Sequence, residues 1–217
     1  MKNSLSLFLK SILIFTLVLV ISLPVYSEEN EITTDETSEY IFMEEIEAID
    51  IFGPAFEDFS IEEKILILRE IFPAGTYWNG YSYNGEGERY LNVSNIGCAH
   101  KSGVENCNSY VGKTKNYFPY YTNIQCLGFA SLISDFLFGK ECELEVFYDF
   151  DELKVGDHIR LVEHTHSMIV IEKGDDYVKI VESNRDYNSC IIVWDREFSK
   201  NKLLYSLGSY EFYRRIP

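Results

Sequence analysis

HSMIVIEKGDDYVKIVES, residues 166–183, carries the strongest fold signal in the chain. Two apolar runs rich in β-branched residues flank Gly174-Asp175, which is typical of two short strands joined by a tight turn. Similar runs bounded by turn residues lie on either side: HIRLVE (158–163), CIIVW (190–194) and LLYSLGSYEFYRR (203–215). We therefore predict an antiparallel β-meander in the C-terminal part of the chain.

Two helices are predicted before these strands. Ser60-Ile61-Glu62-Glu63 is a capping-box sequence that opens a helix, and Pro73 stops it. QCLGFASL (125–132) begins an apolar helix that runs to Phe138, with Thr122 or Asn123 as N-cap and Gly139 just after its end. Helices followed by antiparallel strands predict an α+β fold, with the N-terminal helices packed on a sheet of about five or six strands.

The first 27 residues have the features of a secretory signal peptide. Lys2 and Lys10 precede or flank the apolar run SILIFTLVLVISLP (11–24), and a cleavage site lies near Ser27. The alternative is a retained membrane anchor, but the run is short for a full span. We expect a secreted, extracellular protein with no stable membrane association after cleavage.

The remaining chain divides by composition. Residues 28–55 form an acidic leader, residues 56–122 a helix- and loop-rich part, and residues 123–217 the predicted core. The whole chain has 217 residues and a net charge of −16, and it contains no basic stripe. Such a charge disfavours binding to nucleic acid and to anionic membranes. We expect a monomer without a nucleic-acid partner.

Cys126 lies at the start of the second predicted helix, where backbone N–H groups and the helix dipole stabilise a thiolate. A thiol nucleophile needs a neighbouring base, and the base needs an orienting partner. His166 is the best placed of the four histidines, because it begins an apolar strand. His164, two residues earlier, is an alternative base or a neighbour on the substrate side. The other interpretation of Cys126 is a core cysteine or a disulfide partner.

The hairpin supplies candidates for the orienting partner. A three-residue loop at Lys173-Gly174-Asp175 places His166 opposite Glu182, with Asn184 further along on the same face. Either polar side chain can hold the imidazole in the required tautomer. For the oxyanion, the candidate donors are the backbone N–H of Cys126 and the side chain of Gln125.

Five cysteines in an oxidising compartment leave one unpaired. We predict a Cys98–Cys107 disulfide and, by elimination, a Cys142–Cys190 disulfide, which leaves Cys126 as the thiol. The spacing of Cys98, His100 and Cys107 also suggests zinc, but zinc sites usually show four ligands in tighter paired spacing. No metal and no cofactor are predicted.

Several aromatic side chains lie in a loop rich in glycine and asparagine. Tyr77, Trp78 and Tyr81 either line a substrate groove or pack in the core.

Five ordered blocks of the chain resemble the CHAP group of papain-like cysteine amidases and peptidases: QCLGFASL, GDHIRL, HSMIVI, VESN and IIVWDREFS. The resemblance covers roughly residues 120–200. YWNG (77–80) and the stretch from CAH to ENCNSYVG (98–112) resemble the leading half of secreted Gram-positive proteins that end in this domain.

The resemblance implies a papain-like CHAP fold, with Cys126 as nucleophile and His166 as general base. Glu182 and Asn184 match the two polar positions of the family. It also implies cleavage of amide bonds in peptidoglycan, by an N-acetylmuramoyl-L-alanine amidase or an endopeptidase. Two alternatives remain open: a cysteine peptidase or amidase acting on a non-wall peptide, which the acidic charge favours, and a non-catalytic wall- or partner-binding module.

Overall fold

The computed structural model describes residues 56, 58–98, 107–110, 124–139, 142–186 and 189–216. These residues belong to one compact unit. The predicted signal peptide, the acidic leader, the candidate caps Thr122 and Asn123, and His100 lie outside the described residues. Within the described part, no helix is both long enough and apolar enough to cross a bilayer.

The first helix, α4 (Ile61–Ile71), begins as its sequence predicts. Glu63 N donates to Ser60 Oγ at 3.2 Å, and Ser60 N donates to Glu63 Oε2 at 2.8 Å, which completes the capping box. The helix ends at Ile71, and its C-cap Phe72 lies directly before Pro73. The predicted capping box and stop are therefore confirmed.

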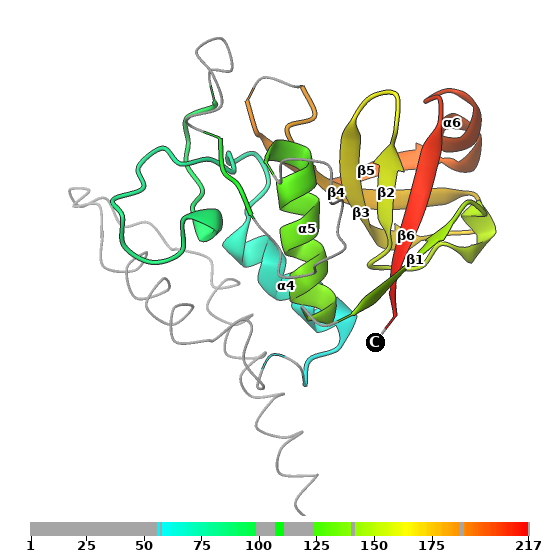
Figure 1. Ribbon diagram of the computed structural model, residues 1–217, viewed down its shortest axis with the longest axis horizontal. Coiled ribbons are helices and arrows are strands. Elements are labelled where there is room, and N and C mark those ends of the chain that lie inside the picture. Colours follow the sequence, from blue (N-terminus) through cyan, green and yellow to red (C-terminus); the bar gives the residue numbers. More distant parts are fainter. Residues whose placement is uncertain are drawn as a thin grey trace, which may run out of the picture. The chain divides into compact units, whose positions relative to one another are not determined.

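The second helix, α5 (Gln125–Phe138), is the centre of the unit. Every residue from Cys126 to Leu137 is buried, as expected for a helix covered on all sides. Gly139 ends the helix with a φ of +78°, a conformation that glycine adopts without a Cβ clash. Figure 1 shows α5 standing between α4 and the sheet, where it packs on β3 and β4.

A buried ion pair fixes the middle of α5 to the last strand. Arg215 is paired with Asp135, and its Nε donates to Ser134 Oγ at 3.0 Å. Tyr110 also donates its hydroxyl to Asp135, at 2.8 Å. Because separating such a pair would leave an uncompensated buried charge, the helix is held in one position relative to the sheet.

The strands form one six-stranded antiparallel sheet in the order β1-β6-β2-β3-β4-β5. Their bounds are β1 (Glu143–Phe147), β2 (His158–Leu161), β3 (His166–Lys173), β4 (Tyr177–Ser183), β5 (Ile192–Ser199) and β6 (Tyr210–Ile216). With its helices, this sheet is an α+β fold, as predicted. The predicted meander is correct for β2 to β5. It does not extend to β1 and β6, which pair with each other at the edge opposite β5, where β6 lies next to β2.

One predicted strand run contains a helix. The run LLYSLGSYEFYRR includes the end of α6 (Lys200–Tyr205) before β6 begins. Lys202 N donates to Ser199 Oγ at 3.3 Å, so a serine cap starts the helix directly after β5. The apolar run alone did not reveal this cap. Two short 3₁₀ helices, η1 (Arg89–Leu91) and η3 (Phe150–Glu152), complete the described elements.

The predicted register of the β3–β4 hairpin is wrong by two residues. Glu182 lies opposite Met168, not opposite His166. Gly174 N donates to Tyr177 O at 3.0 Å, which closes a tighter turn than predicted, and a bulge between Val170 and Glu172 shifts the pairing once more. The total displacement is even, so Glu182 still points to the face that was predicted for it.

One face of the sheet carries the main apolar core. Alternate residues of β2, β3 and β4 meet aromatic side chains from β1, η3, β5 and β6 there. The cluster consists of Phe147, Phe150, Leu153, Ile159, Leu161, Met168, Val170, Val178, Ile180, Phe198, Leu203 and Phe212. The intervening residues Ile169 and Val181 are equally buried, in keeping with α5 covering the other face.

Candidate functional site

Cys126 lies in the first turn of α5, next to the beginning of β3. Its side chain is almost buried, with 8% of the residue exposed. The thiol donates to Thr165 O at 3.6 Å, and the backbone N–H of Ser167 donates to the sulfur. The N-cap residue is Ile124, so the prediction of Thr122 or Asn123 as N-cap is wrong, and Ile124 gives no side-chain hydrogen bond to the helix start. The N–H groups of the first turn therefore receive no side-chain cap from Ile124, and N–H groups at a helix start stabilise an anion.

His166 interacts with Cys126 and is oriented by Glu182. Its Nε2 lies 2.6 Å from Glu182 Oε2, and the Glu182 side chain has no exposed surface. The other carboxylate oxygen, Oε1, accepts from Arg196 Nη1 at 2.6 Å. Because Nε2 is committed to Glu182, Nδ1 is the ring nitrogen that can exchange a proton with the thiol. The structure thus selects Glu182, and not Asn184, as the partner of the imidazole.

The electrostatics of this trio favour a charged pair. Burial raises the pKa of the Cys126 thiol, but the hydrogen bond and charge of His166 outweigh it and hold the pKa below its ordinary value. Burial alone would lower the pKa of His166, yet Cys126 and Glu182 raise it to about 9. Burial also opposes ionisation of Glu182, but His166 and Arg196 keep its pKa below the usual range. Both shifts therefore act in the direction of a thiolate beside an imidazolium.

Two arginines take part in this site although the sequence analysis did not single them out. Arg196 holds Glu182 from β5, and Arg160 adds a buried positive charge that also lowers the pKa of Cys126. Arg160 Nη1 donates to Ser167 Oγ at 2.9 Å. The charge of Arg160 inside the apolar run HIRLVE could have indicated a role for this residue. The place of Arg196 depends on the β4–β5 register, which the sequence does not give.

Asn184 organises the loop next to the nucleophile. Its Nδ2 donates to Gln125 Oε1 at 3.1 Å, and its Oδ1 accepts from Cys190 N at 3.2 Å. Gln125 Nε2 in turn lies 3.8 Å from Cys107 Sγ. The Gln125 amide thus points toward Cys107, so the predicted oxyanion contact requires one of its N–H bonds to turn toward the substrate.

Strained backbone gathers at this site. Among the described residues, six non-glycine positions have positive φ, and four of them lie here: Gln125 (+54°), Thr165 (+46°), Asn184 (+61°) and Cys190 (+60°). Gln125 directly precedes Cys126, and Thr165 directly precedes His166. Such conformations cost free energy and persist where the surrounding structure enforces them, which is common at functional sites.

The residues predicted to lie on the substrate side occupy different environments in the structure. Trp78 is completely buried, donates Nε1 to Tyr90 O at 2.7 Å and packs edge-on against Phe129. The substrate-groove interpretation of Trp78 is therefore wrong, because its ring fills the core beside α5. Tyr77 is half-buried and pairs its backbone with Ser94.

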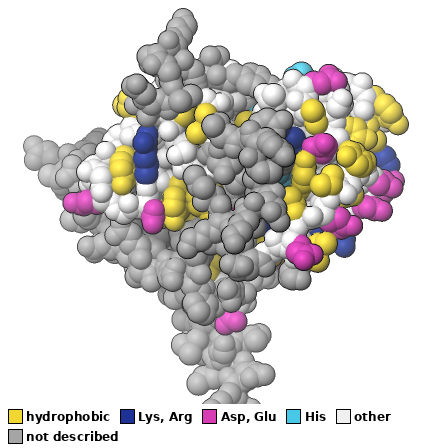
Figure 2. All heavy atoms as spheres, in the orientation of Figure 1, with side chains coloured by type: hydrophobic (Ala, Val, Ile, Leu, Met, Phe, Trp, Pro, Cys, Tyr) yellow, Lys and Arg dark blue, Asp and Glu magenta, His cyan; other side chains and the backbone are white. Residues whose placement is uncertain are grey.

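A small pocket of about 230 Å³ adjoins His166. It is lined by Leu161, His164, His166, Arg185, Arg196, Phe198 and Leu207. His164 is exposed at its rim, as expected for a neighbour of the site. Ligand pockets usually reach about 300 Å³ or more, so this one has room for a single side chain or terminal group. Its basic lining contrasts with the acidic side chains that are visible on the sheet side in Figure 2.

The cysteines do not pair as predicted. None of the five cysteines, all of which the structure describes, forms a disulfide. The Cys142–Cys190 pairing is wrong, since Cys142 Sγ bonds to Phe138 O at 3.1 Å, whereas Cys190 Sγ lies 3.6 Å from Cys107 Sγ. Cys98 and Cys107 do lie in one buried cluster, but as thiols and with Cys190 as the third member. Pairing the cysteines by elimination failed because the turn after β4 brings Cys190 to the earlier segments that carry Cys98 and Cys107.

Comparisons of the chain with protein-family models, with curated proteins and with solved structures found no match.

Proposed function

We propose that the chain is a cysteine hydrolase of amide bonds. The observation that carries the proposal is the buried trio of Cys126, His166 and Glu182, in which a thiol at a helix start meets an imidazole oriented by a carboxylate. Nucleophile, base and orienting group in this order are the requirement for covalent catalysis by a thiol. The resemblance to the CHAP group, with its papain-like fold, agrees with the same three residues.

The chemistry follows from the charged pair. The Cys126 thiolate attacks the carbonyl carbon, and the oxygen becomes an oxyanion near the N–H groups at the start of α5. His166 then donates its proton to the departing amine, and a thioester on Cys126 remains. Water attacks the thioester while His166 takes a proton from it, which releases the carboxylate and restores the thiol.

Peptidoglycan is the substrate we propose first. The protein would cut it either as an N-acetylmuramoyl-L-alanine amidase or as an endopeptidase. The CHAP resemblance and the signal sequence of residues 1–27 support a secreted enzyme that meets the wall. The pocket beside His166 adds a chemical reason, because Arg185 and His164 suit a carboxylate such as those on stem peptides.

The net charge of −16 favours a second candidate, a non-wall peptide or small amide cut by the same chemistry. A strongly acidic surface is repelled by anionic wall polymers.

Product analysis separates these substrates. Purified protein is incubated with defined muropeptides and with a peptide library, and the new amines and carboxylates are identified by mass spectrometry. Wall hydrolysis predicts fragments from muropeptides that are absent with Cys126→Ala. Cleavage of library peptides alone would support the second candidate, and no cleavage of either substrate would contradict the amide-hydrolase proposal.

A further inference from the structure

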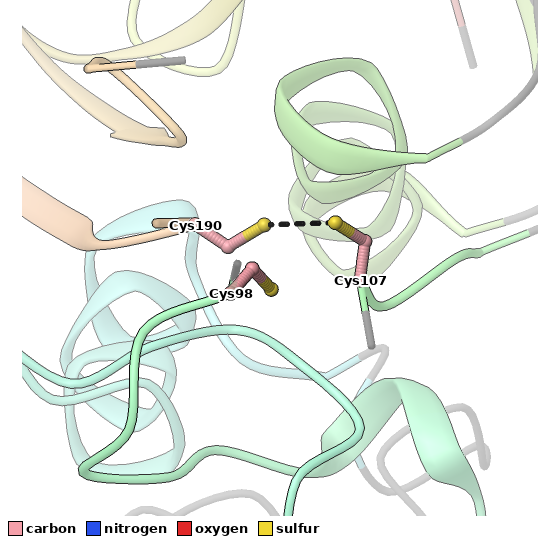
Figure 3. Close-up of side chains that lie close together, drawn as sticks. All are labelled: Cys98, Cys107 and Cys190. Carbon is pink, nitrogen blue, oxygen red and sulfur yellow. Dashed lines mark hydrogen bonds between the residues drawn. The ribbon is translucent and has the colours of Figure 1, made fainter. Parts of the chain in front are cut away.

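Cys98, Cys107 and Cys190 form a second group of thiols outside the trio of Cys126, His166 and Glu182. Their Sγ atoms all lie within 4.8 Å of one another, and Figure 3 shows the three side chains converging from separate segments. Each residue is at most 6% exposed. Residues distant in sequence therefore place three soft ligand atoms around one buried point.

The spacing of the sulfur atoms suits a shared ion. Two thiolates bound to one tetrahedral zinc, at Zn–S distances of about 2.3 Å, lie about 3.8 Å apart. Cys107 Sγ and Cys190 Sγ are 3.6 Å apart, which is far longer than an S–S bond of about 2.05 Å. A disulfide would also leave the third, equally buried sulfur without a role, whereas an ion uses all three.

Side-chain amides around the sulfur atoms add a second observation. Gln125 Nε2 lies 3.8 Å from Cys107 Sγ, and the Asn79 side chain hydrogen-bonds to Cys98. Asn79 is itself fixed, because its Oδ1 accepts from Ser94 Oγ at 2.9 Å. N–H donors directed at metal-bound ligands are the usual outer support of a metal site.

We propose that Cys98, Cys107 and Cys190 bind one thiophilic metal ion, Zn²⁺ in the first instance, through three thiolates. The fourth position of the tetrahedron is taken by water or by an exogenous ligand. The ion ties the loop at Cys98 and the segment at Cys107 to the turn after β4. This site is distinct from Cys126 and does not depend on the proposed hydrolase activity.

The site also supports the residues behind the nucleophile. Cys190 N donates to Asn184 Oδ1 at 3.2 Å, and Gln125 bridges Asn184 and Cys107. Metal binding would therefore fix Gln125, the residue directly before Cys126, through both of its neighbours.

The test measures zinc on the full-length chain. The protein is purified with reductant, loaded with Zn²⁺, desalted and analysed for bound metal, and affinity is measured by competition with a chromophoric chelator. About one ion per chain is expected for wild type. Cys98→Ser, Cys107→Ser and Cys190→Ser should each bind at least about tenfold more weakly. Cys142→Ser and Cys126→Ala are matched controls and should bind like wild type.

A second measurement on wild-type protein guards against variants that fail to fold. Prolonged alkylation with iodoacetamide, followed by peptide mass spectrometry, should label Cys98, Cys107 and Cys190 more slowly with zinc than with chelator, whereas the labelling of Cys142 should be the same in both states. Three results would overturn the proposal: no bound zinc in wild type, loss of zinc in Cys126→Ala, or a Cys107–Cys190 disulfide in protein quenched directly after secretion.

Discussion

Cys126 and the cluster of Cys98, Cys107 and Cys190 are equally buried but chemically opposite. Burial raises the pKa of Cys126, and the charge and hydrogen bond of His166 reverse the effect. Hydrogen bonding to Cys107 raises the pKa of Cys98 to about 11, and the same neighbour raises the pKa of Cys190. The difference indicates that the neighbouring groups, and not burial alone, decide in which direction the pKa of a buried thiol moves.

The largest effect is expected on turnover, when the Cys126 thiol is removed and Cys142 serves as the comparison. Cys126→Ala should lower amide hydrolysis by at least about 10⁴-fold, since the nucleophile is lost, and it should leave the melting temperature nearly unchanged. Cys142→Ala, a cysteine outside both groups, is the control and should keep wild-type turnover. Product release measured by mass spectrometry checks both variants, and residual cleavage by Cys126→Ala at the wild-type rate would contradict the mechanism.

The next effect comes from the orienting carboxylate. Glu182→Gln keeps the shape of the side chain but removes the charge that raises the pKa of His166, so turnover should fall by about 10²–10⁴-fold. Glu172→Gln is the control and should keep wild-type turnover, because Glu172 lies near the surface and pairs with Lys179.

A pH profile sharpens this test. On the alkaline side, wild-type activity should fall as the pH rises through about 9, the raised pKa of His166, because the imidazolium proton is then lost. In Glu182→Gln the falling limb should move to lower pH. An unchanged profile with reduced activity would show that Glu182 acts by shape and not by charge.

The smallest effect is expected from Arg160, which contributes less than His166 to the lowered pKa of Cys126. Arg160→Met should slow alkylation of Cys126 at neutral pH by less than about tenfold, since the charge of Arg160 lowers the thiol pKa less than His166 does. Arg69→Met is the matched control, because Arg69 pairs with Asp195 on the surface. If the same alkylation assay showed a larger loss with Arg160→Met than with Glu182→Gln, the main electrostatic support of Cys126 would lie in β2.

The sequence predicted the parts of the fold that depend on local patterns. The capping box at Ser60, the helix from Gln125 to Phe138 and the strand runs around His166 are local signals, and each is present in the structure. The α6 cap at Ser199 and the pairing of β1 with β6 were not predicted. The first was hidden in an apolar run, and the second pairs the first strand in the chain with the last, which local patterns do not reveal.

The candidate site was predictable in its residue types but not in its contacts. Cys126 and His166 lie together with Glu182, one of the two predicted partners, although the hairpin register that placed Glu182 opposite His166 was wrong by two residues. An even error keeps a side chain on its face, so the prediction survived. Arg196 and Cys190 could not be placed, because both depend on how the chain returns after β4.

Site-resolved alkylation against pH tests the central claim, that His166 ionises Cys126, without requiring the substrate. Wild type and His166→Gln are treated briefly with iodoacetamide from pH 5 to about 10, and each cysteine is quantified by peptide mass spectrometry. In wild type, Cys126 should react well below the ordinary thiol pKa while Cys98 and Cys190 stay unlabelled. In His166→Gln its reactivity should move to higher pH, because the hydrogen bond and charge of His166 that offset burial are then lost. Labelling of Cys126 at the same pH in both proteins, or no faster than Cys142 in wild type, would contradict the account.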